Sequence, residues 1–217
     1  MNWVFEKENV LEVAKKMSEL GLVLGSSGNV SSRIREKDGY FAITPIGENY
    51  DTLSVEDIVI VDRNLNIVEG EKPPSSESLL HIAIYENRPD VGGIVHNHAV
   101  YSSVVAVTGK EIPVIIDEMV LTLGGPIKVS EYAPPASEEL ASSVNRALGK
   151  SNSAIIGNHG AVSVGCDPKE ALTMSLMTER VAKIFVLASM FGEIREIPQE
   201  SVNAESAVFD MKKRIHK

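Results

Sequence analysis

The sequence predicts one domain that mixes helices and strands, of the α/β or α+β class. The chain has 217 residues, enough for one well-buried core, and no change in composition marks a boundary between two domains. Apolar residues recur at helical spacing in some stretches and form short runs of strand length in others. We therefore treat residues 1–217 as a single domain, of which residues 193–217 form a polar C-terminal tail that frays or packs on a neighbour.

Charge and composition exclude several classes of partner. The formal net charge is -9, and the basic residues are scattered among acids, so no basic stripe is available for a nucleic acid or an anionic membrane. The longest apolar run, residues 181–191, is too short to span a bilayer, and residues 1–9 lack the apolar core of a signal peptide. A single cysteine, Cys166, fits a reducing compartment. We expect a soluble, cytoplasmic protein.

An amphipathic helix is the first predicted element. Residues 9–20 place apolar side chains on one stripe, and Gly21 follows the last turn. Residues 25–33 are rich in Gly and Ser and lead into a strand. Exposed N–H groups in such a loop suit an anion, although a plain turn is the alternative. Further short strands are expected at residues 40–44, 58–62 and 66–68.

A second helix is predicted at residues 76–87, after a segment with two prolines, two serines and an acid. Two interpretations compete here. In one, Ser75 only caps the helix and Glu77 favours its dipole. In the other, the free N–H groups bind a substrate phosphate and Glu77 reaches a metal ion. His81 lies one helical turn after Glu77, and we expect it to be structural.

Two apolar runs of strand length end in histidine. Residues 92–95 lead into His96 and His98, which share one face of an extended chain because alternate side chains point the same way. Residues 154–157 lead into His159. If these runs lie side by side, the three imidazoles form a set that holds a catalytic zinc ion and leaves a fourth position for water or substrate. The alternative is three surface or hydrogen-bonded core histidines.

An acidic pair interrupts an apolar run in the second half of the chain. Asp117 and Glu118 lie within residues 111–123. Acids among apolar residues are costly unless they are paired or face a cleft, so both are candidates for a catalytic acid or base. A solvated bend between two strands is the alternative.

The rest of the second half alternates helices and strands. Ser137 caps a helix that ends near residue 148, and Pro168 opens a long helix to about residue 190, after which Gly192 follows. The other expected elements are a helix at residues 99–107 and strands at residues 127–129 and 161–165.

Five motifs stand in a recognisable order and spacing. They are Gly28-Asn29-Val30-Ser31, Thr44-Pro45-x-Gly47, Pro74-Ser75-Ser76-Glu77, His96-Asn97-His98-Ala99-Val100 and Asn158-His159-Gly160. Together they resemble the zinc-dependent class II sugar-phosphate aldolases, and within that family the L-fuculose-1-phosphate aldolases most. The resemblance covers residues 9–192, and the combination is far more specific than any single motif.

The resemblance implies a three-layer α/β/α sandwich with a mainly antiparallel central sheet, assembled as a homotetramer. It also implies one Zn²⁺ per subunit, held by His96, His98 and His159, with Glu77 as a further ligand and proton carrier. The substrate would be a small sugar phosphate. Its phosphate is expected on Gly28, Asn29, Thr44, Gly47, Ser75 and Ser76.

The activity implied by the resemblance is the reversible cleavage of a ketose 1-phosphate into dihydroxyacetone phosphate and an aldehyde. This sequence departs from the fuculose enzymes in one place, because Asp117 and Glu118 stand where those enzymes carry a catalytic tyrosine. A second family tyrosine has no counterpart in residues 193–217, which contain only Phe209 as an aromatic residue.

These departures keep other activities open. L-ribulose-5-phosphate 4-epimerase and methylthioribulose-1-phosphate dehydratase belong to the same family, and a non-catalytic module like the adducin head shares its fold. A cupin would also use a His-x-His strand, but the predicted helices at residues 9–20, 76–87 and 168–190 argue against a nearly all-β chain.

Overall fold

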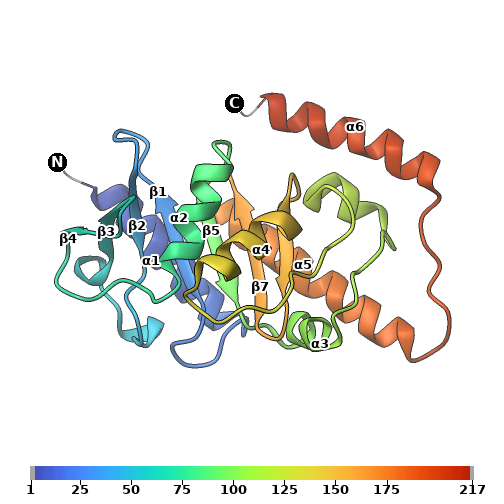
Figure 1. The fold of residues 1–217 in the computed structure, drawn as a ribbon, viewed down its shortest axis with the longest axis horizontal. Coiled ribbons are helices and arrows are strands. Elements are labelled where there is room, and N and C mark those ends of the chain that lie inside the picture. Colours follow the sequence, from blue (N-terminus) through green and yellow to red (C-terminus); the bar gives the residue numbers. More distant parts are fainter. Residues whose placement is uncertain (1–2, 216–217) are drawn as a thin grey trace.

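The molecule is built around one antiparallel sheet. A computed structural model describes residues 3–215. The seven strands of the sheet follow the order β4-β3-β2-β1-β5-β7-β6, and each neighbouring pair is antiparallel (Figure 1). The strands are β1 (Asn29–Arg33), β2 (Tyr40–Ile43), β3 (Val59–Asp62), β4 (Ile67–Glu69), β5 (Gly93–Asn97), β6 (Ser153–Ile156) and β7 (Gly160–Gly165). The predicted α/β class with a mainly antiparallel sheet is confirmed.

Helices cover both faces of this sheet (Figure 1). Ile94 and Val95 are neighbours on β5, yet they enter different apolar clusters because successive side chains of a strand point to opposite faces. The cluster of Ile94 is closed by α2 (Ser78–Asn87) and α4 (Glu138–Leu148). The opposite face packs on α1 (Val4–Glu19), α3 (Val100–Thr108) and α5 (Pro168–Ser189).

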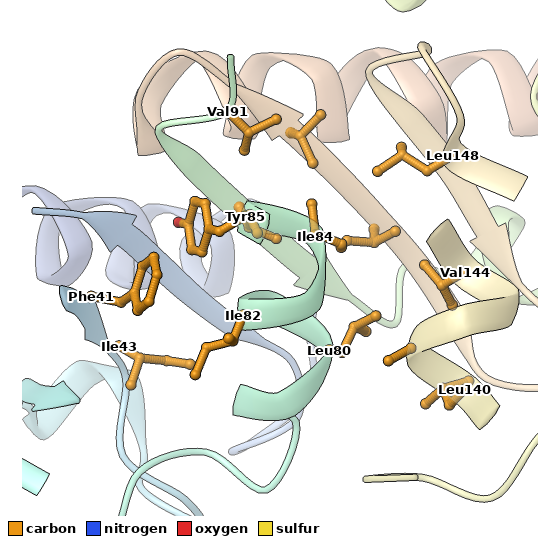
Figure 2. Close-up of a cluster of buried hydrophobic side chains, with 14 of the residues drawn as sticks. Phe41, Ile43, Leu80, Ile82, Ile84, Tyr85, Val91, Leu140, Val144 and Leu148 are labelled. Atoms are coloured by element: carbon orange, nitrogen blue, oxygen red, sulfur yellow. The ribbon is translucent and has the colours of Figure 1, made fainter. Parts of the chain in front are cut away.

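Figure 2 shows how α2 and α4 pack on the sheet. Leu80 and Ile84 of α2 face Leu140 and Val144 of α4, and all four are almost fully buried. Burying a side chain of this size contributes about 1.5–3 kcal/mol. This packing fixes α2, and α2 carries Glu77 at its N-terminus.

The start of α2 differs from the sequence prediction, because the helix begins at Ser78 rather than at residue 76. Pro74 forms a bridge with Pro45, and the Ser75 N–H donates to the Thr44 carbonyl oxygen over 3.0 Å. These contacts keep the chain extended up to Ser75. Its hydroxyl oxygen accepts from the Glu77 N–H over 3.3 Å.

Two predictions for other regions were also wrong, one of a helix boundary and one of a strand. Helix α1 begins at Val4 rather than at residue 9. Residues 127–129 do not form a strand, because Ile127 bridges to Ile112 while Val129 bridges to Ile155, and two different partners give no continuous ladder. Residues 119–123, part of a predicted apolar run, form a π-helix, η3 (Met119–Leu123).

The segment predicted as a tail contains a helix, α6 (Gln199–Ile215), which lies across the end of the sheet opposite to α3 (Figure 1). Phe209 is 7% exposed and lies against Gly124, and the Lys213 ammonium donates to the Lys150 carbonyl oxygen over 2.8 Å. Thus α6 packs on its own chain. None of the helices described in residues 3–215 has the length and apolar composition to cross a membrane.

Candidate active site

The end of β5 presents His96 and His98 on one side. Asn97 lies between them and points away, where its amide donates to the Ser175 hydroxyl over 2.6 Å and its oxygen accepts from the Ala99 N–H over 2.9 Å. These bonds fix the turn into α3. The side chains alternate across the strand, as the sequence predicted.

His159 comes from the short turn between β6 and β7. Asn158 in this turn has a φ of 56°, a left-handed conformation that Asn tolerates, and its N–H donates to the Ala106 carbonyl oxygen over 3.0 Å. Gly160 follows, where a Cβ would lie 2.3 Å from the Asn97 carbonyl oxygen. Only glycine permits this approach, which places His159 beside the end of β5.

The three imidazoles form one cluster. Their ring centroids are 4.8–4.9 Å apart, and each ring has a nitrogen within 4.8 Å of those of the other two. His96 Nδ1 lies 2.9 Å from the Ala161 carbonyl oxygen, an acceptor, so this nitrogen carries the proton and Nε2 keeps a free lone pair. His96 Nε2 lies 3.0 Å from His98 Nε2.

Glu77 completes the cluster from the N-terminus of α2. Its carboxylate oxygens lie 2.8 Å from His96 Nε2 and 3.4 Å from His159 Nε2, and it accepts from the Asn29 amide over 3.3 Å. Burial raises the pKa of Glu77, but the adjacent imidazoles of His96 and His159 and the hydrogen bond from the Asn29 amide outweigh burial and lower the pKa overall. The carboxylate is therefore ionised at neutral pH.

The donor set fits a divalent metal ion. The Glu77 Oε1 atom is buried and has no hydrogen-bond partner among residues 3–215, and it converges with imidazole nitrogens that also offer lone pairs. Ligand atoms of a tetrahedral zinc ion with Zn–N bonds of about 2.0–2.1 Å lie roughly 3.3 Å apart, close to the spacing here. Burial and the proximity of His96 and His159 lower the pKa of His98 to about 4, so the ring is neutral and able to bind metal at pH 7.

His81 has a different environment, and the structure places it outside the cluster of His96, His98 and His159. Its Nδ1 lies 2.6 Å from the Ser31 hydroxyl, which lies 2.8 Å from the Tyr85 hydroxyl. Burial lowers the pKa of His81 to about 3, which keeps the ring neutral. This arrangement matches the structural role expected for His81.

The residues expected to bind phosphate lie on segments next to Glu77. Gly28 has a φ of 73°, and a Cβ there would lie 2.6 Å from the His96 carbonyl oxygen, so glycine allows this loop to pass directly over β5. The Thr44 hydroxyl accepts from the Val30 N–H over 3.2 Å, and Thr44 also pairs with Ser75. Asn29, Thr44 and Ser75 are buried, whereas Gly47 and Ser76 are exposed.

The acidic pair lies elsewhere on the surface. Asp117 and Glu118 are both exposed, and Glu118 forms an ion pair with Arg180. Within residues 3–215, neither carboxylate has a hydrogen bond or ion pair with the three histidines. Their catalytic role stays a prediction.

Two supporting residues had no signal in the sequence. Glu179 on α5 accepts from the N–H groups of Tyr101 and Ser102 over 2.9 and 2.8 Å, and so caps the helix that follows His98. The Tyr50 hydroxyl donates to the Gly28 carbonyl oxygen over 2.5 Å and holds the glycine loop. Both partners are distant in the chain, so no local pattern marks them.

Comparisons with known proteins agree with the geometry. Residues 8–186 match the family described as Class II Aldolase and Adducin N-terminal domain. The chain is 34% identical to L-fuculose phosphate aldolase of Escherichia coli (strain K12) over 82% of this chain and 80% of that protein. It is 29% identical to 5-deoxy-D-ribulose 1-phosphate aldolase of Bacillus thuringiensis serovar kurstaki over 94% and 95%. A solved L-fuculose 1-phosphate aldolase superposes with a TM-score of 0.91 at 33% identity, covering 97% and 98%.

Proposed function

This chain belongs to the class II aldolase and adducin N-terminal domain family and is an aldolase, hence a lyase, and we propose that it cleaves a ketose 1-phosphate reversibly into dihydroxyacetone phosphate and an aldehyde. The single observation that carries the proposal is the convergence of three imidazoles and the Glu77 carboxylate. L-Fuculose 1-phosphate is the leading substrate. A relative named for 5-deoxy-D-ribulose 1-phosphate, aligned over 94% of this chain, supports that sugar as the second candidate.

The metal proposed for this site is Zn²⁺, one ion per chain. His96, His98 and His159 would hold it, and Glu77 would be the fourth ligand in the resting enzyme. Three imidazoles and one exchangeable position form a common zinc site in catalysis. When bound, the ion supplies Lewis-acid stabilisation of the negative charge that develops on substrate oxygens as the C3–C4 bond breaks.

Glu77 is the residue proposed to move a proton. During cleavage the C4 hydroxyl loses a proton, and C3 of the three-carbon fragment gains one. An ionised, buried carboxylate at the metal cluster is suited to carry the proton at C3. Asp117 and Glu118 remain candidates for the proton at the C4 oxygen.

The phosphate is proposed to bind beside Glu77, between the glycine loop and the N-terminus of α2. Asn29 and Ser75 would contact it at the buried end, and Gly28, Thr44, Gly47 and Ser76 would complete the pocket. Free N–H groups and the positive end of the helix dipole favour an anion at this position. Holding the phosphate orients the reacting carbons, which lowers the barrier by several kcal/mol.

A homotetramer is the proposed assembly. Val100, Val104 and Val107 lie on one face of α3 and are 67%, 40% and 70% exposed. This helix begins two residues after His98, so a neighbour seated on it would lie close to the site and bring other surface residues, such as the acidic pair, within reach of it. Light scattering of the purified protein tests this assembly, and a monomer would contradict it.

The decisive experiment is a substrate panel with zinc-loaded protein. Release of dihydroxyacetone phosphate is measured with L-fuculose 1-phosphate and 5-deoxy-D-ribulose 1-phosphate, and the reverse reaction with small aldehydes. We expect cleavage of at least one ketose 1-phosphate. Conversion of only L-ribulose 5-phosphate or only methylthioribulose 1-phosphate would instead identify an epimerase or a dehydratase. A zinc stoichiometry near zero in the purified, unchelated protein, measured before zinc is added, would favour a non-catalytic module.

A further inference from the structure

A cavity of about 820 Å³ is lined in part by Phe209 and Lys213 of α6, at the end of the sheet opposite to the histidines. Strands β1 and β5 are antiparallel, so Asn29 pairs with His96 at the site while Ser32 pairs with Gly93 at the other end. The cavity is lined by residues at that second end, among them Arg33 after Ser32 and Gly92 before Gly93. It is therefore separate from the metal cluster.

The lining combines apolar side chains with an excess of positive charge. Leu121, Met174 and Phe209 contribute apolar surface from η3, α5 and α6. Four basic residues face two acidic ones, which leaves an excess of two positive charges: Arg33, Arg35, Arg88 and Lys213 against Asp90 and Glu170. Pockets that bind small molecules commonly have about 300–1,000 Å³, a mainly apolar lining and a few charged groups.

Two of the four basic groups already make several hydrogen bonds within the fold. Arg88 donates to both carboxylate oxygens of Asp90 and to the carbonyl oxygens of Gly149 and Ser151. The guanidinium of Arg33 donates to the carbonyl oxygens of neighbouring segments and lies 4.9 Å from the centroid of the Tyr85 ring. These two arginines provide positive charge, but they stabilise the fold.

The other two basic groups retain donors for a ligand. Arg35 is exposed, and one terminal nitrogen donates to the Cys166 carbonyl oxygen over 3.2 Å. Lys213 donates to the Lys150 carbonyl oxygen and lies 3.6 Å from Asp90. A guanidinium has five N–H donors and an ammonium has three, so both groups keep N–H donors for a bound oxyanion. Burial and the charge of Arg88 lower the pKa of Lys213 to about 8, so the ammonium is still mainly protonated at pH 7.

We propose that this cavity is a second, non-catalytic binding site for a small organic anion. Its apolar body would pack on Leu121, Met174 and Phe209, and its anionic head would pair with Arg35 and Lys213. Because Phe209 and Lys213 belong to α6, the bound anion would also hold α6 against the sheet. None of these residues belongs to the cluster of three histidines and Glu77 in the same chain.

The test uses 1-anilinonaphthalene-8-sulfonate as the probe, because it joins an aromatic body to a sulfonate and fluoresces in apolar surroundings. The full-length, zinc-loaded protein is titrated with it. We expect saturable binding of one probe per chain. Arg35→Glu and Lys213→Glu should each raise the dissociation constant at least tenfold, and Lys110→Glu, at an exposed lysine outside the cavity, should leave it unchanged.

A third variant separates the cavity from its charged rim. Leu121→Trp keeps the charge but fills the space, so it should also weaken probe binding at least tenfold. Circular dichroism shows that each variant is folded. The proposal is overturned if the wild-type protein shows no saturable binding, if both charge reversals leave the affinity unchanged, or if Leu121→Trp binds the probe as well as the wild type does.

Discussion

Glu77 at one end of the central sheet and Arg88 at the other are both buried, but their hydrogen bonding differs. At the histidine end, Glu77 Oε1 and Asn29 Oδ1 are buried and have no hydrogen-bond partner in the part of the chain that the structure describes. At the α6 end, the guanidinium of buried Arg88 makes four hydrogen bonds, to Asp90, Gly149 and Ser151. An unsatisfied buried group costs about 1–3 kcal/mol, so it is retained where a ligand completes it. Glu77 is therefore placed to bind a ligand, whereas Arg88 stabilises the fold.

The largest effect is expected from a substitution of one of the clustered histidines. We predict that His96→Ala loses the bound metal and at least about 10³-fold of the cleavage activity, because metal stabilisation of several kcal/mol disappears. Metal analysis and the cleavage assay measure both losses. Circular dichroism should show an intact fold, and full turnover by this variant would refute the mechanism.

Glu77→Gln separates proton transfer from metal binding. Three imidazoles remain, so zinc should be retained, while activity should fall by about 10²–10³-fold because the proton carrier is gone. The matched control is Glu86→Gln, which changes an exposed glutamate on the same helix. Equal activity of the two variants would remove Glu77 from the mechanism.

At the other end of the sheet the effect should appear in stability. Arg88→Met leaves Asp90 and two carbonyl oxygens without their donors, so we expect the free energy of unfolding to fall by about 3 kcal/mol. Turnover of the folded protein should stay within about twofold of the wild type. Urea unfolding provides the measurement. As a control, Arg63→Met breaks an exposed pair with Asp38 and should cost no more than about 1 kcal/mol.

The buried His81 gives the histidine end a pH dependence of its own. Its pKa is about 3 in the folded state, against an ordinary value of 6.5 in the unfolded chain, so only the unfolded state takes up a proton as the pH falls below 6.5. Stability is therefore complete above pH 6.5 and declines toward pH 3, by about 2 kcal/mol at pH 5. His81→Gln should remove this share of the decline. Urea unfolding of chelator-treated protein at pH 7.5 and 5 tests it, and identical declines in both proteins would contradict it.

The smallest effect concerns the rim of the phosphate pocket. Ser76 is exposed beside Glu77, and Ser76→Ala should raise KM about tenfold for a phosphorylated substrate while kcat stays within about twofold, because one hydrogen bond of about 1–1.5 kcal/mol is lost. Steady-state kinetics measure both constants. Thr173→Ala, at an exposed position on α5, serves as the control. An unchanged KM in Ser76→Ala would contradict phosphate binding at Ser76.

Local patterns predicted much of the fold and of the metal cluster. The alternation of His96, Asn97 and His98 already placed two imidazoles on one side, because side-chain direction along a strand follows from backbone geometry alone. The start of α2 was not predictable, because contacts of Pro74 and Ser75 with the preceding strand region keep those residues extended. The ion pair of Glu118 was also not predictable from the sequence, because its partner Arg180 lies on α5, far from Glu118 in the chain.

The sequence by itself determined the class of the fold and which histidines are candidate metal ligands. Both follow from local properties, namely the periodicity of apolar residues and the ligand chemistry of imidazole. Only the tertiary structure decided that β7 lies beside β5 and brings His159 to His96, that Glu77 stands between them, and that α6 closes over a second cavity. The reason is physical: strand pairing and helix packing depend on the apolar surface that all segments bury together, and no single segment carries that information.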